Sequence, residues 1–310
     1  MKVVICPKYG PPEVLQFKEV EKPLPQKHEV LIKVVATTVH IGDTKIRALA
    51  PGLGAMKDFF FKPLMRIVVG FTGPRKKVLG MELAGTIEMV GKEVTKFKVG
   101  DNVFGSTAFD FGAYAEYLCL DEHGVLALKP SNMSFEEAAP LSNGGLTALL
   151  NLRRGNLRKG QKVLIYGASG SVGTYAVQLA KHIGAEVTAV CSTKNLALVK
   201  SLGADVVMDY TCEDFTQSKE KYDLIFDAVG KIPAPKRKVS LVKSGVFLDV
   251  LDLSANFKLK AEDLLVLKDL CDAGKLKTVI DKIYSFEQMI EAHRYVEKGH
   301  KKGHVVIAMP

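Results

Sequence analysis

The stretch Lys162-Val-Leu-Ile-Tyr-Gly-Ala-Ser-Gly-Ser-Val-Gly173 decides how this chain folds. It opens with an apolar run, residues 162–166, that is too short for a helix and stops at a glycine. A run of this length with β-branched members predicts a buried strand. From Val172 onward, apolar residues recur at the i, i+3, i+4, i+7 spacing of one helix face until Gly184. This periodicity predicts a helix that begins at the end of the quoted stretch.

The glycines between this strand and helix have physical roles. Read as G-x-G-x-x-G, the motif consists of Ala168, Gly170 and Gly173, so alanine replaces its first glycine. Gly170 allows the backbone to approach a pyrophosphate at the helix N-terminus, and Gly173 allows the helix to pack close to the strand. A second apolar run, residues 186–191, completes a βαβ unit. A glycine-rich turn without a ligand is the alternative. The flanking elements favour a dinucleotide site whose turn residues are Ala168, Ser169, Gly170, Ser171, Val172 and Gly173.

The end of the second strand indicates which nucleotide binds. NAD sites usually place Asp or Glu there to hold the ribose hydroxyls. This chain has Cys191-Ser-Thr-Lys194 instead. Hydroxyls and an ammonium group attract a 2′-phosphate that a carboxylate would repel. The pattern therefore predicts NADPH, with Ser192, Thr193 and Lys194 as ligands, whereas a solvated lysine at a helix start is the alternative for Lys194.

Three motifs in this half of the chain, Gly167–Gly173, Leu202-Gly-Ala-Asp205 and Asp209-Tyr210, resemble the medium-chain dehydrogenase/reductase superfamily. Within it the chain is most similar to the zinc-independent quinone-reductase and enoyl-reductase branch related to zeta-crystallin. The resemblance extends from Tyr9 to Val306. It implies an α/β fold in which a Rossmann doubly wound parallel sheet accompanies a β-rich GroES-like barrel domain.

The resemblance also implies further cofactor contacts. Lys194 and Tyr210 match the branch's lysine and tyrosine that contact the 2′-phosphate, and Thr147 matches a threonine near the nicotinamide. Two later strands are expected to end near Val229 and Val250. They would reach the carboxyl edge of the sheet, where ligands bind in open α/β folds.

The order of the predicted elements suggests a chain that leaves one domain and returns to it. We expect a GroES-like catalytic domain over residues 1–125, a Rossmann cofactor domain over 126–255, and a return to the catalytic domain over 256–310. Ser134 and Ser285 each begin a capping box, which predicts a helix start. Residues 3–5, 29–36, 82–90 and 113–120 are the strand-like segments expected in the first domain.

Two positions in the first domain bear on metal chemistry. Zinc-dependent relatives carry Cys and His where this chain has Ile41 and Met81. Neither side chain suits Zn²⁺, so we expect no metal ligands and no catalytic zinc. His40 and Tyr114 are the candidate proton or hydrogen-bond donors, although a satisfied, partly buried histidine is the alternative for His40 and water is an equal candidate as donor. Asp43 is expected to brace its turn rather than act as a base.

These features predict an NADPH-dependent, zinc-free oxidoreductase. Its acceptor would be a quinone, or the C=C bond of an enone or enal, because conjugation delocalises the developing negative charge. One alternative is an NADPH-binding protein without turnover, either crystallin-like or RNA-binding. An alcohol dehydrogenase is a further alternative, which Ile41 and Met81 disfavour.

Composition sets the remaining bounds. The chain has 310 residues and a net charge of +9, but its basic residues are scattered, so we expect no nucleic-acid partner. Five cysteines without a C-x-x-C spacing indicate free thiols and a cytoplasmic location, and the N-terminal apolar run is too short for a signal peptide. No apolar stretch is long enough to span a membrane. Dimers of the branch often pair strands near residues 251–260, so a homodimer is left open.

One segment of the first domain stands apart in composition. Residues 56–77 are aromatic, Met-rich and basic. A lid over the substrate pocket and a helix packed on the barrel are both compatible with it, and an interfacial membrane contact is a third reading. In the lid reading, Phe59, Phe60, Phe61 and Met65 would cover the mouth of the pocket.

Overall fold

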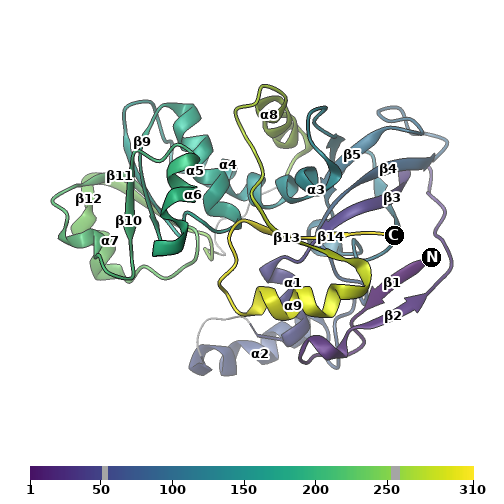
Figure 1. Cartoon of the computed structure of the whole chain (residues 1–310). Helices are drawn as coiled ribbons and strands as arrows, with labels where there is room; N and C mark the ends of the chain where they lie inside the picture. Colours follow the sequence, from purple (N-terminus) through teal and green to yellow (C-terminus); the bar gives the residue numbers. More distant parts are fainter. Residues whose placement is uncertain (51–54, 253–258) are drawn as a thin grey trace. The chain divides into compact units, whose positions relative to one another are not determined.

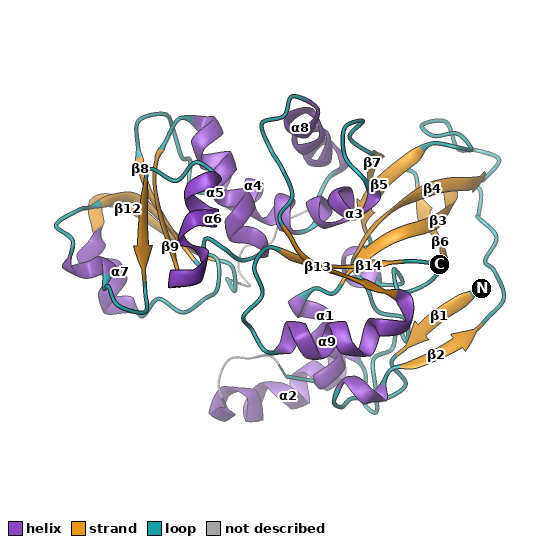
Figure 2. Ribbon diagram, viewed as in Figure 1, coloured by secondary structure: helices purple, strands orange, loops and turns teal. Residues whose placement is uncertain are grey.

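The computed structural model describes residues 1–50, 55–252 and 259–310, and the side chains of 55–61 lie outside the description. It has the expected α/β class, and the chain forms two compact units (Figures 1 and 2). Unit 1 comprises residues 1–143, 260–265 and 280–310, and unit 2 comprises residues 144–259 and 266–279. The chain thus leaves unit 1 and later returns to it.

Unit 2 contains the predicted doubly wound sheet. Its strands lie in the order β10-β9-β8-β11-β12, and every neighbouring pair is parallel. The quoted stretch supplies β8 and the start of α5, as its periodicity predicts. The strands are β8 (Lys162–Tyr166), β9 (Glu186–Cys191), β10 (Val206–Asp209), β11 (Tyr222–Asp227) and β12 (Leu241–Asp249).

Helices connect these strands. The apolar face of α5 is buried, and α5 packs against β8, β9 and α4. Gly184 ends α5 in the left-handed conformation at φ 88°, which glycine adopts without strain. The helices of unit 2 are α4 (Gly144–Arg154), α5 (Ser171–Ile183), α6 (Leu196–Ser201) and α7 (Ala234–Ser240), with short 3-10 turns at η4 (Thr193–Asn195) and η5 (Phe215–Gln217).

Unit 1 is built on a seven-stranded sheet. The order is β13-β14-β3-β4-β5-β7, and β6 pairs with β3 off this path. A separate antiparallel pair is formed by β1 (Lys2–Ile5) and β2 (Gln16–Glu19). The sheet strands are β3 (Glu29–Thr38), β4 (Glu82–Val90), β5 (Asn102–Ser106), β6 (Tyr117–Asp121), β7 (Val125–Leu128), β13 (Ile280–Ser285) and β14 (His304–Ala308).

The helices of unit 1 explain where it ends. Unit 1 continues to Asn143, beyond the expected boundary at residue 125, because α3 and η3 pack against its strands β3 and β4. Both predicted capping boxes, at Ser134 and Ser285, are confirmed. The helices are α1 (Ile41–Ala48), α2 (Ala55–Val69), α3 (Phe135–Ala138) and α9 (Met289–Glu297), with 3-10 turns at η1 (Pro12–Val14), η2 (Ala108–Asp110), η3 (Ala139–Ser142) and η6 (Phe286–Gln288).

Helix α8 is divided between the two units, and helix α2 has exposed apolar side chains. Helix α8 (Ala261–Asp272) begins in the part of the chain assigned to unit 1 and ends in the part assigned to unit 2. In the described end of α2, the side chains of Leu64, Ile67 and Val68 are each more than half exposed, so they are not part of a packed core. Within the described residues, no helix combines the length and hydrophobicity that crossing a membrane requires.

Candidate cofactor site and active site

The residues predicted to hold the dinucleotide lie at the carboxyl edge of the unit 2 sheet. The chain proceeds from β8 to β9 on one side, and after β10 it crosses to β11 on the other side of β8. The carboxyl ends of β8 and β11 therefore form the point where the strand order reverses. Open α/β sheets bind ligands at this point.

The glycine turn, residues 167–173, has the geometry that a pyrophosphate requires. Gly170 is the N-cap of α5 in an extended conformation and provides no side-chain cap, so the helix N-terminus lacks the usual capping oxygen. The first-turn amides of a helix have no intrahelical acceptor and attract anions. A Cβ at Gly173 would lie 2.2 Å from the Gly167 carbonyl oxygen and 2.7 Å from Ala168 Cα. Only glycine therefore allows α5 to approach the turn this closely.

The side chains of the glycine turn have unequal exposure. Ala168 is fully buried, so its methyl group contributes to packing. Ser169 is also buried, and its hydroxyl accepts a hydrogen bond from Asn195 Nδ2 at 3.0 Å. Ser171 and Val172 form the first turn of α5. Backbone amides, more than side chains, are therefore what the turn offers to a ligand.

The predicted 2′-phosphate ligands meet where β9 and β10 end. Ser192 precedes η4, Thr193 and Lys194 lie within it, and Lys194 is exposed. Tyr210 is 49% exposed, its amide donates to the Cys191 carbonyl at 3.1 Å, and its ring lies 6.1 Å from that of Tyr166. The structure thus brings Ser192, Lys194 and Tyr210 to one edge, as an NADPH site requires.

Two residues that were not predicted as cofactor contacts organise this edge. Asn195 is buried and donates through Nδ2 to both Ser169 Oγ and Ser192 Oγ, which links the glycine turn to the segment that follows β9. Asp209 is buried, and hydrogen bonds from the hydroxyls of Thr193 and Thr211 lower its pKa to about 2. The Thr193 hydroxyl is therefore engaged within the protein. For Asn195, the available sequence signal was its position directly after Ser192-Thr-Lys194.

The remaining predicted cofactor residues also belong to unit 2. Val229 is 40% exposed and its methyl groups lie against Gly167, where an added Cβ would be 2.9 Å away. The Val250 amide donates to the Asp227 carbonyl at 3.0 Å, so the chain after β12 stays beside the end of β11. Thr147 is partly buried on α4, the helix that packs against α5.

In unit 1, His40 is the N-cap of α1 and is partly buried. Its Nδ1 accepts a hydrogen bond from the Gly42 amide at 3.0 Å, which leaves the proton on Nε2. Burial, together with the charges of Lys301 and Lys45, lowers the pKa of His40 to about 4. His40 is therefore neutral at physiological pH and can donate an N–H group, but it holds no ionisable proton to give.

Lys301 is a residue that sequence reasoning missed. Antiparallel pairing of β14 with β3 places Val305 beside Val39, and this pairing brings the segment before β14 near His40. Burial lowers the pKa of Lys301 to about 8, and its Nζ donates to the Gly303 carbonyl at 2.6 Å. We call His40, Asp43, Lys45 and Lys301 the His40 corner.

Asp43 acts as the predicted brace. It is fully buried, and its carboxylate accepts from the backbone amides of His40 at 3.1 Å and Gly80 at 3.2 Å. Burial raises its pKa to about 7. Tyr114 is fully buried in the same core beside Asp43, and its hydroxyl forms no hydrogen bond of normal geometry among the described residues. Burial and the adjacent Asp43 carboxylate raise the pKa of Tyr114 well above 10. This placement favours a structural role for Tyr114 over proton donation.

The positions of the zinc ligands in zinc-dependent relatives do not fit a metal here. A Cβ added at Gly42, the residue after Ile41, would lie 3.5 Å from Met81 Sδ. Met81 and the start of α1 are therefore close neighbours. An alkyl group and a thioether occupy the two positions, and Zn²⁺ prefers thiolate, imidazole or carboxylate. Ile41 and Met81 therefore do not form a zinc site.

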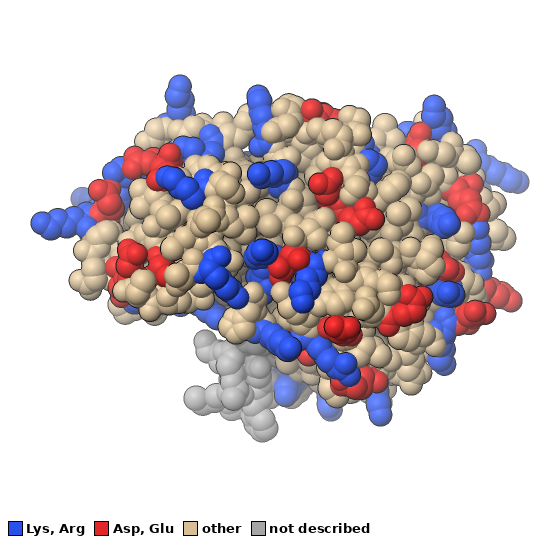
Figure 3. All heavy atoms as spheres, in the orientation of Figure 1, with Lys and Arg blue, Asp and Glu red and all other residues tan. Residues whose placement is uncertain are grey.

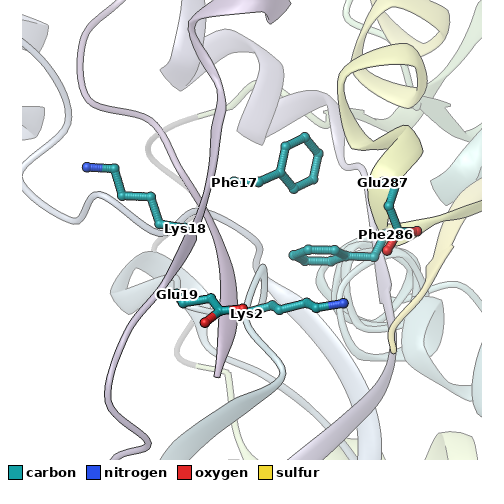
Figure 4. A pocket seen from close by; sticks show the side chains of 6 residues that line it. All are labelled: Lys2, Phe17, Lys18, Glu19, Phe286 and Glu287. Atoms are coloured by element: carbon teal, nitrogen blue, oxygen red, sulfur yellow. The ribbon is translucent and has the colours of Figure 1, made fainter.

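A separate pocket in unit 1 contains none of the predicted site residues. Figure 4 shows its lining, in which the rings of Phe17 and Phe286 pack edge to face with centroids 5.4 Å apart. The pocket is lined by Lys2, Phe17, Lys18, Glu19, Phe286 and Glu287.

Comparison with known proteins agrees with this geometry. Residues 26–130 match the family model described as alcohol dehydrogenase GroES-like domain, and residues 202–307 match the one described as zinc-binding dehydrogenase. The chain is 35% identical to 2-methylene-furan-3-one reductase of Solanum lycopersicum, over 96% of this chain and 76% of that protein. It is 32% identical to the chloroplastic NADPH-dependent alkenal/one oxidoreductase of Arabidopsis thaliana, over 99% of this chain and 79% of that protein.

A solved structure extends the similarity to the whole fold. The quinone oxidoreductase from Coxiella burnetii superimposes with a TM-score of 0.81 at 29% identity, over 100% of this chain and 99% of that one. The expected superfamily, fold class and NAD(P)H-dependent oxidoreductase class are thereby confirmed. The chain belongs to the medium-chain dehydrogenase/reductase superfamily, within the family of quinone and alkenal oxidoreductases.

Proposed function

We propose that this protein uses NADPH to reduce a quinone or the C=C bond of an α,β-unsaturated carbonyl compound. The observation that carries the proposal is the His40 corner, where a neutral imidazole N–H group lies near the charges of Lys45 and Lys301. Hydride addition to a conjugated acceptor develops negative charge on oxygen, and hydrogen-bond donors and nearby cations stabilise it. The names of the tomato and Arabidopsis relatives support the same acceptor class.

The residues of this chain divide the work. NADPH, when bound, supplies the hydride. The first turn of α5 and Gly170 would bind the pyrophosphate, while Ser192, Lys194 and Tyr210 would bind the 2′-phosphate. His40 would donate its Nε2 hydrogen to the acceptor oxygen, and the two lysines would hold positive charge near it.

The direct test measures NADPH oxidation with 9,10-phenanthrenequinone, with an α,β-unsaturated ketone and with the matching saturated ketone. Turnover of the first two acceptors and not of the third is the expected result. Binding of NADPH without turnover would instead support the crystallin-like or RNA-binding alternative. Turnover of the saturated ketone would support an alcohol dehydrogenase.

A variant of His40 tests its assigned role. His40→Ser keeps a side-chain oxygen that can cap α1 but removes the imidazole N–H. Loss of one such donor should lower kcat by about 100-fold while the dissociation constant of NADPH stays unchanged. An unchanged kcat would remove His40 from the reaction.

We also propose that catalysis proceeds without zinc, since Ile41 and Met81 occupy the two ligand positions. Strong chelators should then leave the rate of NADPH oxidation unchanged.

The lid over the substrate pocket is likewise our proposal, although the side chains of Phe59, Phe60 and Phe61 lie outside the described residues. Its support is the described end of α2, where Leu64 and Val68 are more than half exposed while Met65 is partly buried.

Replacing residues 56–70 by a short Gly-Ser link tests the lid. NADPH binding should remain, and turnover of large, flat acceptors should fall more than that of small ones. Unfolding of the shortened protein would show that the segment is core packing.

A homodimer and a cytoplasmic location stay predictions. β12 is an edge strand of the unit 2 sheet, which is the place where a second copy could extend the sheet. Sedimentation equilibrium would measure the oligomeric state.

The five free cysteines are compatible with the predicted cytoplasmic location, but the curated relatives named above include a chloroplastic one. On the face shown in Figure 3 many basic side chains lie beside acidic ones, which supports the expectation of no nucleic-acid partner.

A further inference from the structure

Three side chains with metal-binding atoms meet at one end of the unit 1 sheet. His28 directly precedes β3, and Glu122 and His123 lie in the turn between β6 and β7. Antiparallel pairing of β3 with β6 brings these segments together, and the Glu122 amide donates to the His28 carbonyl at 2.9 Å. One ligand atom from each of the three side chains lies within 4.8 Å of the other two.

Glu122 is held as a fixed ligand. Its side chain is 1% exposed, and its Oε2 accepts hydrogen bonds from the Thr95 and Lys96 amides at 2.8 Å each. These two bonds fix the orientation of the carboxylate. Within the part of the chain that the structure describes, Oε1 accepts no hydrogen bond and faces the two imidazoles. A carboxylate oxygen that faces two imidazoles offers, together with them, the ligand types that bind a transition-metal ion.

His28 is oriented in the manner of a metal ligand. Its Nε2 lies 3.0 Å from Glu93 Oε2, a position from which the carboxylate can accept the Nε2 proton and leave Nδ1 to bind a metal. That Nδ1 lies 3.8 Å from Glu122 Oε1. Metal-binding histidines commonly donate their other ring N–H to a carboxylate in this way.

His123 completes the cluster from the same turn as Glu122. Its Nε2 lies 3.7 Å from the same oxygen, Glu122 Oε1. Both histidine-to-carboxylate separations are too long for hydrogen bonds. Ligands placed 2.0–2.1 Å from a tetrahedral Zn²⁺ are about 3.3 Å apart, so small rotations of the exposed imidazoles would bring the three atoms onto one ion.

We propose that His28, Glu122 and His123 bind a divalent transition-metal ion of the zinc class, with water in the remaining coordination position. Imidazole and carboxylate ligands suit Zn²⁺ and its first-row neighbours. The ion joins the start of β3 to the β6–β7 turn, and through Glu122 to the loop that contains Thr95 and Lys96. It therefore stabilises this end of the unit 1 sheet.

This ion has no part in hydride transfer. His28 precedes β3 and His40 follows it, and β3 is 10 residues long. At about 3.3 Å per residue the strand alone is roughly 30 Å long, and the two histidines lie beyond its opposite ends. The proposal is therefore compatible with a zinc-free active site at Ile41 and Met81, and it does not depend on the proposed function.

Metal titration tests the site directly. Protein without a histidine tag is treated with chelator, dialysed, and titrated with Zn²⁺ alone by calorimetry and with Co²⁺ alone by visible absorption. The wild type should bind one ion, and Co²⁺ should give the absorption of a low-coordinate N/O site. His123→Ala and His28→Ala should each weaken Zn²⁺ binding by at least about 10-fold, and Glu93→Gln by about 10-fold.

Two controls separate this site from other causes. His182→Ala, at the exposed end of α5, should bind Zn²⁺ as the wild type does. Zn²⁺ should raise the Tm of the wild type and not that of His123→Ala. Equal binding by the wild type and His123→Ala, or no binding at micromolar Zn²⁺, would overturn the proposal and leave the cluster as two exposed histidines beside a glutamate.

Discussion

The glycine turn of unit 2 and the His40 corner of unit 1 are built in different ways. The glycine turn presents mainly backbone amides, and all its parts come from one short stretch, residues 162–173. The His40 corner presents side chains, and Lys301 joins it from the far end of the sequence through the pairing of β14 with β3. Backbone sites require glycines at fixed places, whereas side-chain sites require a correct tertiary fold and allow exchange of residues.

The largest expected effect tests the backbone site. Gly173→Ala places a methyl group 2.2 Å from the Gly167 carbonyl oxygen, which cannot rotate away. Overpacking against backbone should lower the free energy of unfolding by about 3 kcal/mol and impair NADPH binding. Thermal denaturation and a fluorescence titration with NADPH measure the two effects.

Gly170→Ala is the matched control. A Cβ at Gly170 meets only the Gly167 carbonyl oxygen, at 3.3 Å, and Gly170 has φ −81°, which alanine adopts readily. This variant should keep the wild-type Tm but bind NADPH more weakly, because the methyl group lies where the pyrophosphate approaches. Equal loss of stability in both variants would contradict the distinct roles of the two glycines.

The next effect tests the buried polar side chains of unit 1. His293 is fully buried, its Nδ1 accepts from Arg47 Nε at 3.4 Å, and its Nε2 has no hydrogen-bond partner among the described residues. Burial, with the Arg47 charge, lowers its pKa to about 3. Below about pH 6.5 His293 is therefore protonated in the unfolded chain but still neutral in the folded one. The folded state loses stability relative to the unfolded state as the pH falls through this range.

The measurement compares wild type with His293→Phe. Between pH 7 and pH 5 the wild type should lose about 2 kcal/mol more free energy of unfolding than the variant. The difference between the two proteins removes the opposing contribution of Asp43, whose pKa burial raises to about 7. His182→Ala should follow the wild type. Parallel curves for wild type and His293→Phe would show that His293 is protonated in the folded protein.

These two regions also differ in what could be predicted from the sequence. The strand, glycine turn and helix around residues 162–173 were predictable because each depends on neighbours in the chain. Asn195 was not, since its two hydroxyl partners, Ser169 and Ser192, meet only when β8 and β9 pair. Lys301 was not, because strand pairing alone brings it near His40.

Exposure was the least predictable property. Tyr114 was a candidate donor because it has a hydroxyl in a region expected to be strand. Its side chain is buried because it packs against Gly80, a contact that the sequence pattern does not show. In α2, the apolar side chains of Leu64, Ile67 and Val68 were compatible with burial, and the structure leaves them exposed. Hydrophobicity patterns indicate which side chains favour burial, and they do not show whether a partner surface is available.

A smaller effect tests the nucleotide preference. Lys194→Ala should raise the dissociation constant of NADPH by about 10-fold or more, the loss of one charge-assisted contact, and leave that of NADH nearly unchanged. Lys200→Ala, in the following helix, is the control and should change neither. Binding of NADPH and NADH with equal affinity by the wild type would refute the NADPH prediction.

The smallest effect is expected for Tyr114→Phe, and it decides between two roles. The Tyr114 hydroxyl is buried beside Asp43 and forms no hydrogen bond of normal geometry among the described residues, and the pKa of Tyr114 is raised well above 10. Removing a buried hydroxyl that lacks a well-formed hydrogen bond has a small effect, so the free energy of unfolding should change by less than about 1 kcal/mol. If Tyr114 is structural, kcat also stays at the wild-type value. If it is the proton donor, kcat should fall by about 100-fold or more, because general acid catalysis contributes that much. The rate of NADPH oxidation at saturating acceptor, measured beside His40→Ser, separates the two cases. A large fall for Tyr114→Phe would mean that the core around Gly80 opens during turnover and that proton donation takes place inside unit 1.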